Sequence, residues 1–260
     1  MNNTIDFKEA LLNVIKGAGA IVKKGFETEF DISHKEGVNN LVTEVDKASE
    51  RYITQYLKEL FPDHGFIGEE FGNENEEALY KWVIDPIDGT VNFAHRMPLC
   101  CVSIALTYKD QPIFGAVYNP MMNELFFAEK GKGAFLNGKP IHVSEKQDIN
   151  TAFFVTGFPY NFPETKIHPI DVFSKVVRLG LPVRRLGSAA LDLCWLACGR
   201  FDVFWEYNLQ AWDIAAGYLI VEEAGGTITD FSLNPHSIWD KETLASNTIL
   251  HKELIPLLFS

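Results

Sequence analysis

The sequence has 260 residues, of which 47% are hydrophobic and 22% charged, a composition typical of a globular protein with a substantial core. Its length fits one large domain or two closely packed halves, and no apolar run approaches the ~20 residues that a membrane-spanning helix needs. The formal net charge of −12, with no basic run longer than a pair such as Arg184 and Arg185, disfavours nucleic-acid binding through a basic face.

The first predicted elements are two amphipathic helices separated by a polar segment. Apolar residues recur at helical spacing over residues 5–26, where Gly25 suits the end of the helix. Residues 28–40 are polar and predict a loop or a mobile hairpin. A second helix is predicted over residues 43–61, and Pro62 stops it.

A change of period after this helix predicts a run of strands. Residues 82–84 form a short buried strand that leads to Asp85. Further strands are predicted at 101–108, 113–118, 124–128, 133–136 and 141–143. The segments 109–112 and 137–140 supply turns, and the Asn-Gly pair in the second is the stronger signal. This pattern predicts an antiparallel meander.

The second half of the sequence alternates between strands and helices. Strands are predicted at 152–156, 183–186, 202–206 and 226–230, and helices at 166–179, 188–198 and 212–224. Such alternation predicts helices packed on a sheet. We expect two halves, residues 1–145 and 146–260, although no flexible linker marks the boundary.

The four cysteines favour packing over metal binding. They are Cys100, Cys101, Cys194 and Cys198. None forms a Cys-x-x-Cys pair, and no histidine lies at zinc-ligand spacing from them. Together with polar first residues that do not resemble a signal peptide, this predicts a cytoplasmic protein.

Five carboxylates stand out because they follow predicted strands, one of them a short buried strand over residues 66–68, or open a predicted helix. They are Glu69, Glu70, Asp85, Asp88 and Asp213. Anionic oxygens that converge on one point repel strongly unless cations lie between them. The pattern therefore predicts a site for hard divalent cations.

Residues 85–90 read Asp-Pro-Ile-Asp-Gly-Thr and carry the strongest of these signals. We expect a strand to deliver Asp85, Pro86 to stop strand pairing, and Asp88 to turn back towards Asp85. Both carboxylates and the Ile87 carbonyl could then face one Mg²⁺, which takes six oxygens at ~2.1 Å. Gly89 permits the turn, and a short helix is predicted over residues 90–97, whose first N–H groups suit phosphate.

Other interpretations of these segments exist. Residues 85–90 could be an ordinary Asp-Gly turn, and their spacing fits neither an EF-hand loop nor the Asp-x-Asp of phosphatases that form a phosphoaspartate. Glu69 and Glu70 could be a solvated pair, and Asp213 could simply cap a helix. Asp46, taken alone, is typical of a helix start.

Four segments taken together resemble the inositol monophosphatase family of Mg²⁺-dependent, Li⁺-sensitive phosphatases. They are residues 41–46 (Leu-Val-Thr-Glu-Val-Asp), 68–70 (Gly-Glu-Glu), 85–90, and 212–217 (Trp-Asp-Ile-Ala-Ala-Gly). The resemblance covers nearly the whole chain. It implies an α+β fold, a layered α-β-α-β-α sandwich of two α/β halves with the metals between them.

The resemblance also implies a metal-ligand set. Glu69, Asp85 and the Ile87 carbonyl would hold one Mg²⁺, and Asp85, Asp88 and Asp213 a second. Glu69 would support a third, largely water-bound ion, so two to three ions are expected.

Catalytic and substrate-binding roles follow from the same resemblance. Glu70, Asp46 and Thr90 would orient a water that attacks phosphorus directly, without a phosphoenzyme. The implied substrate contacts are Lys35, Asp88, Gly89, Thr90, Gly187, Ser188, Ala189, Glu206 and Asp213.

The implied activity is Mg²⁺-dependent hydrolysis of a small phosphate monoester, with inositol monophosphate as the first candidate. Fructose-1,6-bisphosphate, NADP(H) and 3′-phosphoadenosine 5′-phosphate are alternative substrates on the same fold. The aromatic, proline-rich residues 157–165 depart from the family's more familiar polar loop and leave inositol selectivity open. A regulatory or RNA-associated binding protein is the alternative of a different class. A homodimer is expected by analogy, and direct nucleic-acid or membrane contact is not.

Overall fold

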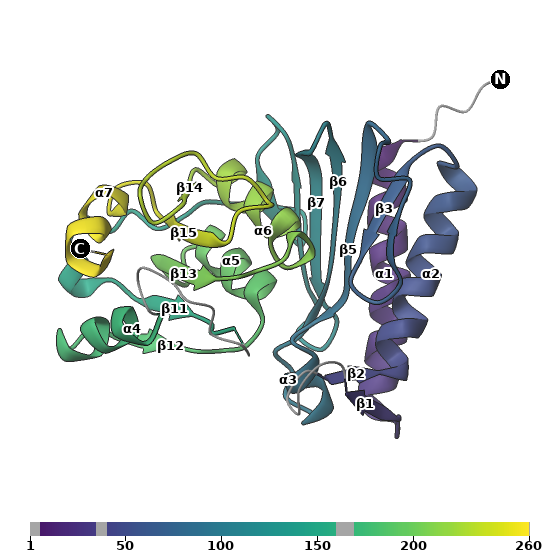
Figure 1. Cartoon of the computed structure of the whole chain (residues 1–260), viewed down its shortest axis with the longest axis horizontal. Helices are drawn as coiled ribbons and strands as arrows, with labels where there is room; N and C mark the ends of the chain where they lie inside the picture. Colours follow the sequence, from purple (N-terminus) through teal and green to yellow (C-terminus); the bar gives the residue numbers. More distant parts are fainter. Residues whose placement is uncertain (1–5, 35–40, 160–168, 260) are drawn as a thin grey trace.

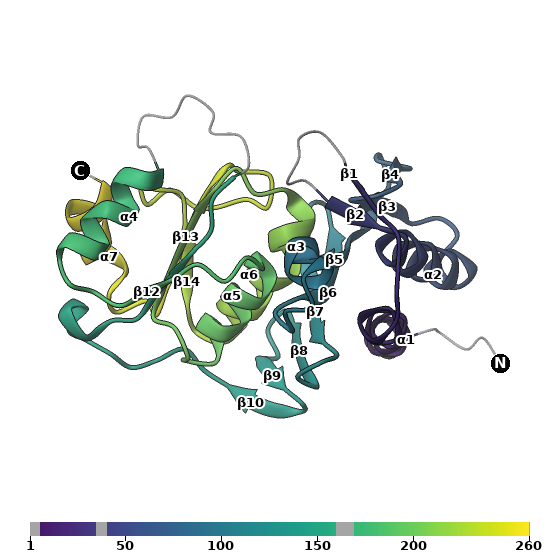
Figure 2. The same ribbon diagram turned by 90° about the horizontal axis from the view of Figure 1, so that it is seen from below.

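Helices and sheets alternate in layers across the molecule, as the α-β-α-β-α expectation requires (Figure 1). This computed structural model describes residues 6–34, 41–159 and 169–259. From below, α1 and α2 lie on one outer side and α4 and α7 on the opposite one, with both sheets and α5 and α6 between them (Figure 2). Among the described residues no helix is long and apolar enough to cross a membrane.

The outer helices α1 (Phe7–Glu27) and α2 (Glu44–Leu60) confirm the two predicted amphipathic helices. They cover one face of an eight-stranded sheet in the order β10-β9-β8-β7-β6-β5-β3-β4. Its strands are β3 (Gly65–Gly68), β4 (Gly72–Glu74), β5 (Tyr80–Asp88), β6 (Cys101–Tyr108), β7 (Gln111–Asn119), β8 (Glu124–Glu129), β9 (Ala134–Leu136) and β10 (Lys139–Ile141).

The meander from β5 to β10 is antiparallel throughout, as predicted. Its last strand was predicted at 141–143 and this is wrong, because β10 begins at Lys139 opposite Leu136. Asn137 and Gly138 both have positive φ, 50° and 76°, so they close the hairpin in two residues and pairing resumes at once.

Two small elements flank the sheet near the predicted polar segment. Strand β1 (Ile32–His34) pairs with β2 (Leu41–Thr43), and residues 35–40 lie outside the described residues. Helix α3 (Thr90–Ala94) is shorter than the predicted 90–97, because Arg96 has a positive φ of 58° that helical backbone does not allow.

The second sheet has five strands in the order β12-β11-β13-β15-β14. They are β11 (Phe154–Thr156), β12 (Val183–Arg184), β13 (Val203–Tyr207), β14 (Thr227–Thr229) and β15 (Glu242–Ser246). The associated helices are α4 (Pro169–Arg178), α5 (Ala189–Ala197), α6 (Ala211–Glu223), α7 (His251–Leu254), a 3₁₀ turn (Ile149–Thr151) and a π-helical segment (Ile255–Phe259). The predicted alternation is confirmed, whereas β15 and α7 were not predicted.

Helices α5 and α6 form the central layer and are buried against both sheets. Every residue of α5 is buried, and its composition, apolar on all sides except at Asp192, suits a helix packed on two faces. Small residues allow the close approach: a Cβ on Gly115 of β7 would lie 2.9 Å from the Ala216 carbonyl oxygen of α6. The first turns of α5 and α6 lie at the edge of the first sheet. The division of the chain near residue 145 stays a prediction.

Candidate functional site

The site begins where two parallel strands end side by side. Strand β3 runs parallel to β5, with Gly68 opposite Ile84, and the Glu69 N–H donates to the Ile84 carbonyl at 3.3 Å. Because the carboxyl ends of parallel strands meet at one edge of a sheet, Glu69 emerges beside Asp85. The strand order thus joins two acidic clusters that are separated in sequence.

Pro86 interrupts the pairing of β5 with β6, as predicted, but strand β5 does not end there. It continues to Asp88, and the pairing with β6 shifts register between Asp85 and Asp88. Pro86 and Ile87 occupy this bulge, where the missing N–H of proline leaves no ladder bond broken. The Ile87 N–H instead donates to the Asp85 Oδ1 at 3.0 Å, which fixes that carboxylate.

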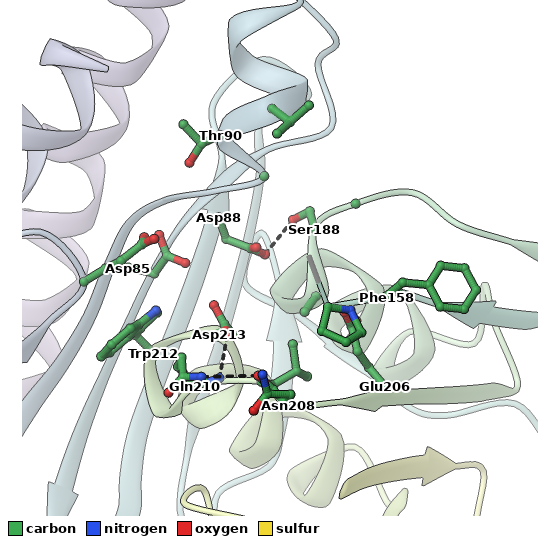
Figure 3. Close-up of a pocket in the computed structure, with 18 of the residues that line it drawn as sticks. Asp85, Asp88, Thr90, Phe158, Ser188, Glu206, Asn208, Gln210, Trp212 and Asp213 are labelled. Carbon is green, nitrogen blue, oxygen red and sulfur yellow. Dashed lines mark hydrogen bonds between the residues drawn. The ribbon is translucent and has the colours of Figure 1, made fainter. Parts of the chain in front are cut away.

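Three carboxylates from two segments far apart in the sequence converge at this edge (Figure 3). Asp85, Asp88 and Asp213 each offer one oxygen, and these oxygens lie within 4.8 Å of one another. Asp213 comes from the first turn of α6, where it also accepts the Gln210 N–H at 2.6 Å. Asp213 therefore caps α6 and also belongs to the acidic cluster, so both interpretations of this residue are correct.

Asp88 is bound by the start of α5. Its Oδ2 accepts the Ser188 hydroxyl and the Ala190 N–H, both at 2.7 Å. The positive end of the helix dipole adds to this attraction. A carboxylate of the first sheet is therefore held in place by a helix of the central layer.

Burial and mutual repulsion shift the acids of this cluster in the same direction. Burial, reinforced by Glu69 and the neighbouring acids, raises the pKa of Asp85 well above its usual value. Burial also raises the pKa of Asp213, with Asp88 as the next cause, and it raises the pKa of Asp88 to about 6. Full ionisation at neutral pH therefore requires compensating positive charge. A cluster of hard oxygen donors with this requirement fits a divalent cation such as Mg²⁺.

Asp46, a further buried acid, lies next to Thr90. The Thr90 Oγ1 is 3.2 Å from the Asp46 Oδ1 and 2.9 Å from the Ile87 carbonyl oxygen. Asp46 is fully buried and accepts the Thr43 N–H at 2.8 Å and the Thr43 hydroxyl, which makes a capping box at the start of α2. Burial is the largest cause that raises the pKa of Asp46 to about 7, with Glu69 among the further causes.

The acidic cluster and Thr90 line a cavity of about 410 Å³ between the two sheets, whereas Asp46 and Glu70 are not among its lining residues. Its lining includes all but one of the predicted substrate contacts: Asp88, Gly89, Thr90, Gly187, Ser188, Ala189, Glu206 and Asp213. Lys35 lies outside the described residues, as do residues 160–165 of the aromatic loop. Burial, then Asp213 and Asp88, raise the pKa of Glu206 to about 8.

Sequence reasoning missed several polar residues near the site. Arg185 lines the cavity, and Asp192 is buried with both oxygens lacking a hydrogen-bond partner among the described residues. Glu50 of α2 is buried and accepts two N–H groups of the turn after β3. The available signal was a charged residue on the apolar face of a predicted helix.

Comparison with known proteins agrees with this geometry. The profile of the inositol monophosphatase family matches residues 6–259. The chain belongs to this family. Its members are phosphoric monoester hydrolases, and the chain is an enzyme of that class.

Individual members of the family show how much of the chain is shared. Inositol monophosphatase 2 of Solanum lycopersicum is 42% identical, over 96% of this chain and 97% of the relative. The Nus factor SuhB of Pasteurella multocida is 39% identical, over 94% and 92%. The solved inositol monophosphatase of Anabaena (Nostoc) sp. PCC 7120 superposes with a TM-score of 0.86 at 36% identity, over 96% of this chain and 94% of that one.

Proposed function

We propose that this protein is a Mg²⁺-dependent phosphatase that hydrolyses a small phosphate monoester, with inositol monophosphate as substrate. The observation that carries the proposal is the convergence of Asp213 with Asp85 and Asp88, whose carboxylate oxygens lie within 4.8 Å of one another. Such a set suits cations that bridge to substrate phosphate, because Mg²⁺ commonly keeps positions for water and phosphate oxygens.

In the proposed ligand scheme, Asp85 contributes to two metal ions. Glu69, Asp85 and the Ile87 carbonyl would hold one ion, and Asp85, Asp88 and Asp213 another, with Glu69 supporting a third. Bound Mg²⁺ supplies a Lewis acid for the phosphoryl oxygens and lowers the pKa of the attacking water. Asp88 keeps its position through Ser188 and Ala190, so one of its oxygens is fixed before substrate arrives.

Thr90 and Asp46 would orient the attacking water together with Glu70. Thr90 donates its single hydroxyl hydrogen towards Asp46 or the Ile87 carbonyl, which leaves its lone pairs for a hydrogen from water. A pKa near 7 suits Asp46 to accept a proton through Thr90 at neutral pH. Attack is direct and in line, so no phosphoenzyme forms.

The phosphate would bind where β5 meets α3. Gly89 has a φ of 89°, and a Cβ there would lie 2.9 Å from the Leu99 carbonyl oxygen, so only glycine fits this turn. The N–H groups of Gly89 and Thr90 at the helix start are the phosphate donors in this scheme.

The charges of the cavity favour a polyol monophosphate over a substrate with two phosphates. Among the described lining residues Arg185 is the cationic side chain, and it interacts with the carboxylate of Glu206. The acidic lining residues are Glu69, Asp85, Asp88, Glu206 and Asp213. A second phosphate would lack cationic partners here, whereas hydroxyl groups can donate to Glu206 and to backbone carbonyls of residues 187–189.

A second candidate function is regulatory binding, because a relative of 39% identity carries the name Nus factor SuhB. The net charge of −12 disfavours direct contact of this chain with RNA. Li⁺ sensitivity and a homodimer remain predictions by analogy, and a cytoplasmic location remains a prediction from the cysteines and the polar first residues.

Phosphate release from a substrate panel tests the proposal. Metal-free protein is assayed with and without Mg²⁺ on inositol 1-phosphate, fructose-1,6-bisphosphate, NADP and 3′-phosphoadenosine 5′-phosphate. We expect turnover only with Mg²⁺ and a kcat/KM at least ~10-fold higher for inositol 1-phosphate, the size of one net hydrogen bond. Preference for a bisphosphate would overturn the substrate assignment, and no Mg²⁺-stimulated turnover on any substrate would favour the binding role.

A further inference from the structure

Helix α2 presents three buried polar side chains to the site. Asp46, Ser49 and Glu50 occupy positions i, i+3 and i+4, so they share one face of the helix. Asp46 is the acceptor for Thr90, and the Ser49 hydroxyl donates to the Pro86 carbonyl at 3.3 Å. The third side chain, Glu50, has no part in the function proposed above.

Glu50 binds the turn between β3 and β4 with both carboxylate oxygens. Its Oε2 accepts the Glu70 N–H at 2.9 Å, and its Oε1 accepts the Phe71 N–H at 3.0 Å. Glu50 is only 1% exposed, so water does not replace these acceptors. Two adjacent backbone donors therefore depend on one side chain.

The same carboxylate also lies directly against Gly68. A Cβ on Gly68 would come within 2.2 Å of the Glu50 Oε1. Glu50 thus touches the residue before Glu69 and holds the N–H of the residue after it. The N–H of Glu69 itself is bonded to the Ile84 carbonyl of β5. The backbone of Glu69 has little freedom left.

We propose that Glu50 is a positioning residue for the metal site. It fixes the turn that carries Glu69, so that this side chain enters the Asp85 cluster without further ordering of the backbone. This inference rests on the proposed function in one respect, namely that Glu69 contributes to Mg²⁺ binding. Residues that orient metal ligands commonly change metal affinity by ~10–100-fold when they are replaced.

A glutamine at this position separates hydrogen bonding from shape. Glu50→Gln keeps the size of the side chain but offers one acceptor and one NH₂ donor to two N–H groups. One of the two turn amides must then lose its partner, since a donor would face a donor. The turn is loosened while the packing of α2 is kept.

Glu223 supplies a matched control far from the acidic cluster. Its carboxylate also accepts two backbone N–H groups, those of Gly131 at 2.7 Å and Gly133 at 2.8 Å, in the turn between β8 and β9. Glu223→Gln therefore makes the same chemical change at a turn of the same kind. Any effect on Mg²⁺ that it shares with Glu50→Gln comes from general loosening of the fold.

Calorimetric Mg²⁺ titration of metal-free protein and amide hydrogen exchange test the proposal without an activity assay. For Glu50→Gln we expect Mg²⁺ affinity to fall by ~10-fold or more and the Glu70 or Phe71 amide to exchange faster. For Glu223→Gln we expect faster exchange at Gly131 or Gly133, with Mg²⁺ affinity within about twofold of the unchanged protein.

Two results would overturn the inference: unchanged Mg²⁺ affinity in Glu50→Gln, or an equal loss in Glu223→Gln. Should Glu50→Gln fail to fold, Gly68→Ala displaces the same carboxylate through its added methyl group and faces the same criteria. If the substrate panel shows no turnover but Mg²⁺ affinity falls as expected, the proposed function fails and the role of Glu50 stands.

Discussion

Asp213→Asn should stabilise the metal-free protein while removing its response to Mg²⁺. The asparagine Oδ1 can still accept the Gln210 N–H that begins α6, now held by Asp213 at 2.6 Å, so the helix cap is kept. What is lost is one negative charge beside Asp85 and Asp88. Those carboxylate oxygens lie within 4.8 Å, where two unit charges at an effective dielectric constant of 20 repel by about 3.5 kcal/mol.

The expected gain is smaller than this Coulomb figure, because protonation already relieves part of the repulsion. Burial raises the pKa of Asp88 to about 6 and that of Asp85 well above its usual value. We therefore expect Asp213→Asn to raise the free energy of unfolding by about 1–3 kcal/mol in EDTA at neutral pH. Mg²⁺ at a hundred times its Kd would add about 2.7 kcal/mol to the unchanged protein and little to the variant. Phosphate release should fall by ~100-fold or more.

Urea unfolding with EDTA and with Mg²⁺ measures both effects on the same samples. Asp240→Asn is the matched control, because Asp240 likewise accepts the N–H of the residue three before it, Ser237, at 2.7 Å. It should leave the Mg²⁺ response intact. A variant Asp213→Asn that is less stable than the unchanged protein in EDTA, yet gains as much from Mg²⁺, would refute the repulsion argument and the metal assignment together.

Two further predictions concern residues around the cluster and in the outer layer. Ser188→Ala removes the 2.7 Å hydrogen bond to Asp88, and we expect calorimetry to show Mg²⁺ binding weakened by ~10-fold with little change in melting temperature. Burial lowers the pKa of His251 to about 4, below the unfolded value of 6.5, so the unfolded chain binds more protons between these pH values. Stability should thus be lost as pH falls from 6.5 to 4, by at most about 3 kcal/mol from this residue. In urea unfolding, His251→Gln should reduce the loss of unfolding free energy between pH 6.5 and 4 relative to the unchanged protein. An identical pH dependence would contradict the attribution of this loss to His251.

Periodicity predicted the long elements well, because each of them has one consistent environment along its length. Helices α1 and α2 have an apolar face on the first sheet and a polar face outward, which is the pattern that sequence reading detects. Strand β15 (Glu242–Ser246) was missed for the opposite reason. Its order Glu-Thr-Leu-Ala-Ser is short and carries no hydrophobic run, and only its pairing with β13 and β14 defines it.

Within the candidate site, motifs identified residues that open or close an element, and failed for residues that act through tertiary contacts. Asp85 and Asp213 stand at a strand end and a helix start, and their spacing in sequence is readable. The bulge at Pro86 was misjudged, because only the neighbouring strand β6 decides whether pairing resumes. Glu50 gave only the signal of a charged residue on the apolar face of a predicted helix, and its partners Glu70 and Phe71, 20 and 21 residues away, could not be read from the sequence.

The acidic cluster is unfavourable for folding, and the elements around it hold its carboxylates in place. Unmetallated, Asp85, Asp88 and Asp213 repel and must be partly protonated, so the folded state would be more stable without them. The surrounding layers offset this by fixing each acid from a different direction. The bulge N–H holds Asp85, the start of α5 holds Asp88, and the Gln210 N–H holds Asp213. A cluster assembled from separate layers can keep its geometry in the absence of cations, which is what tight binding of Mg²⁺ requires, because no part of the binding free energy is then spent on ordering the ligands.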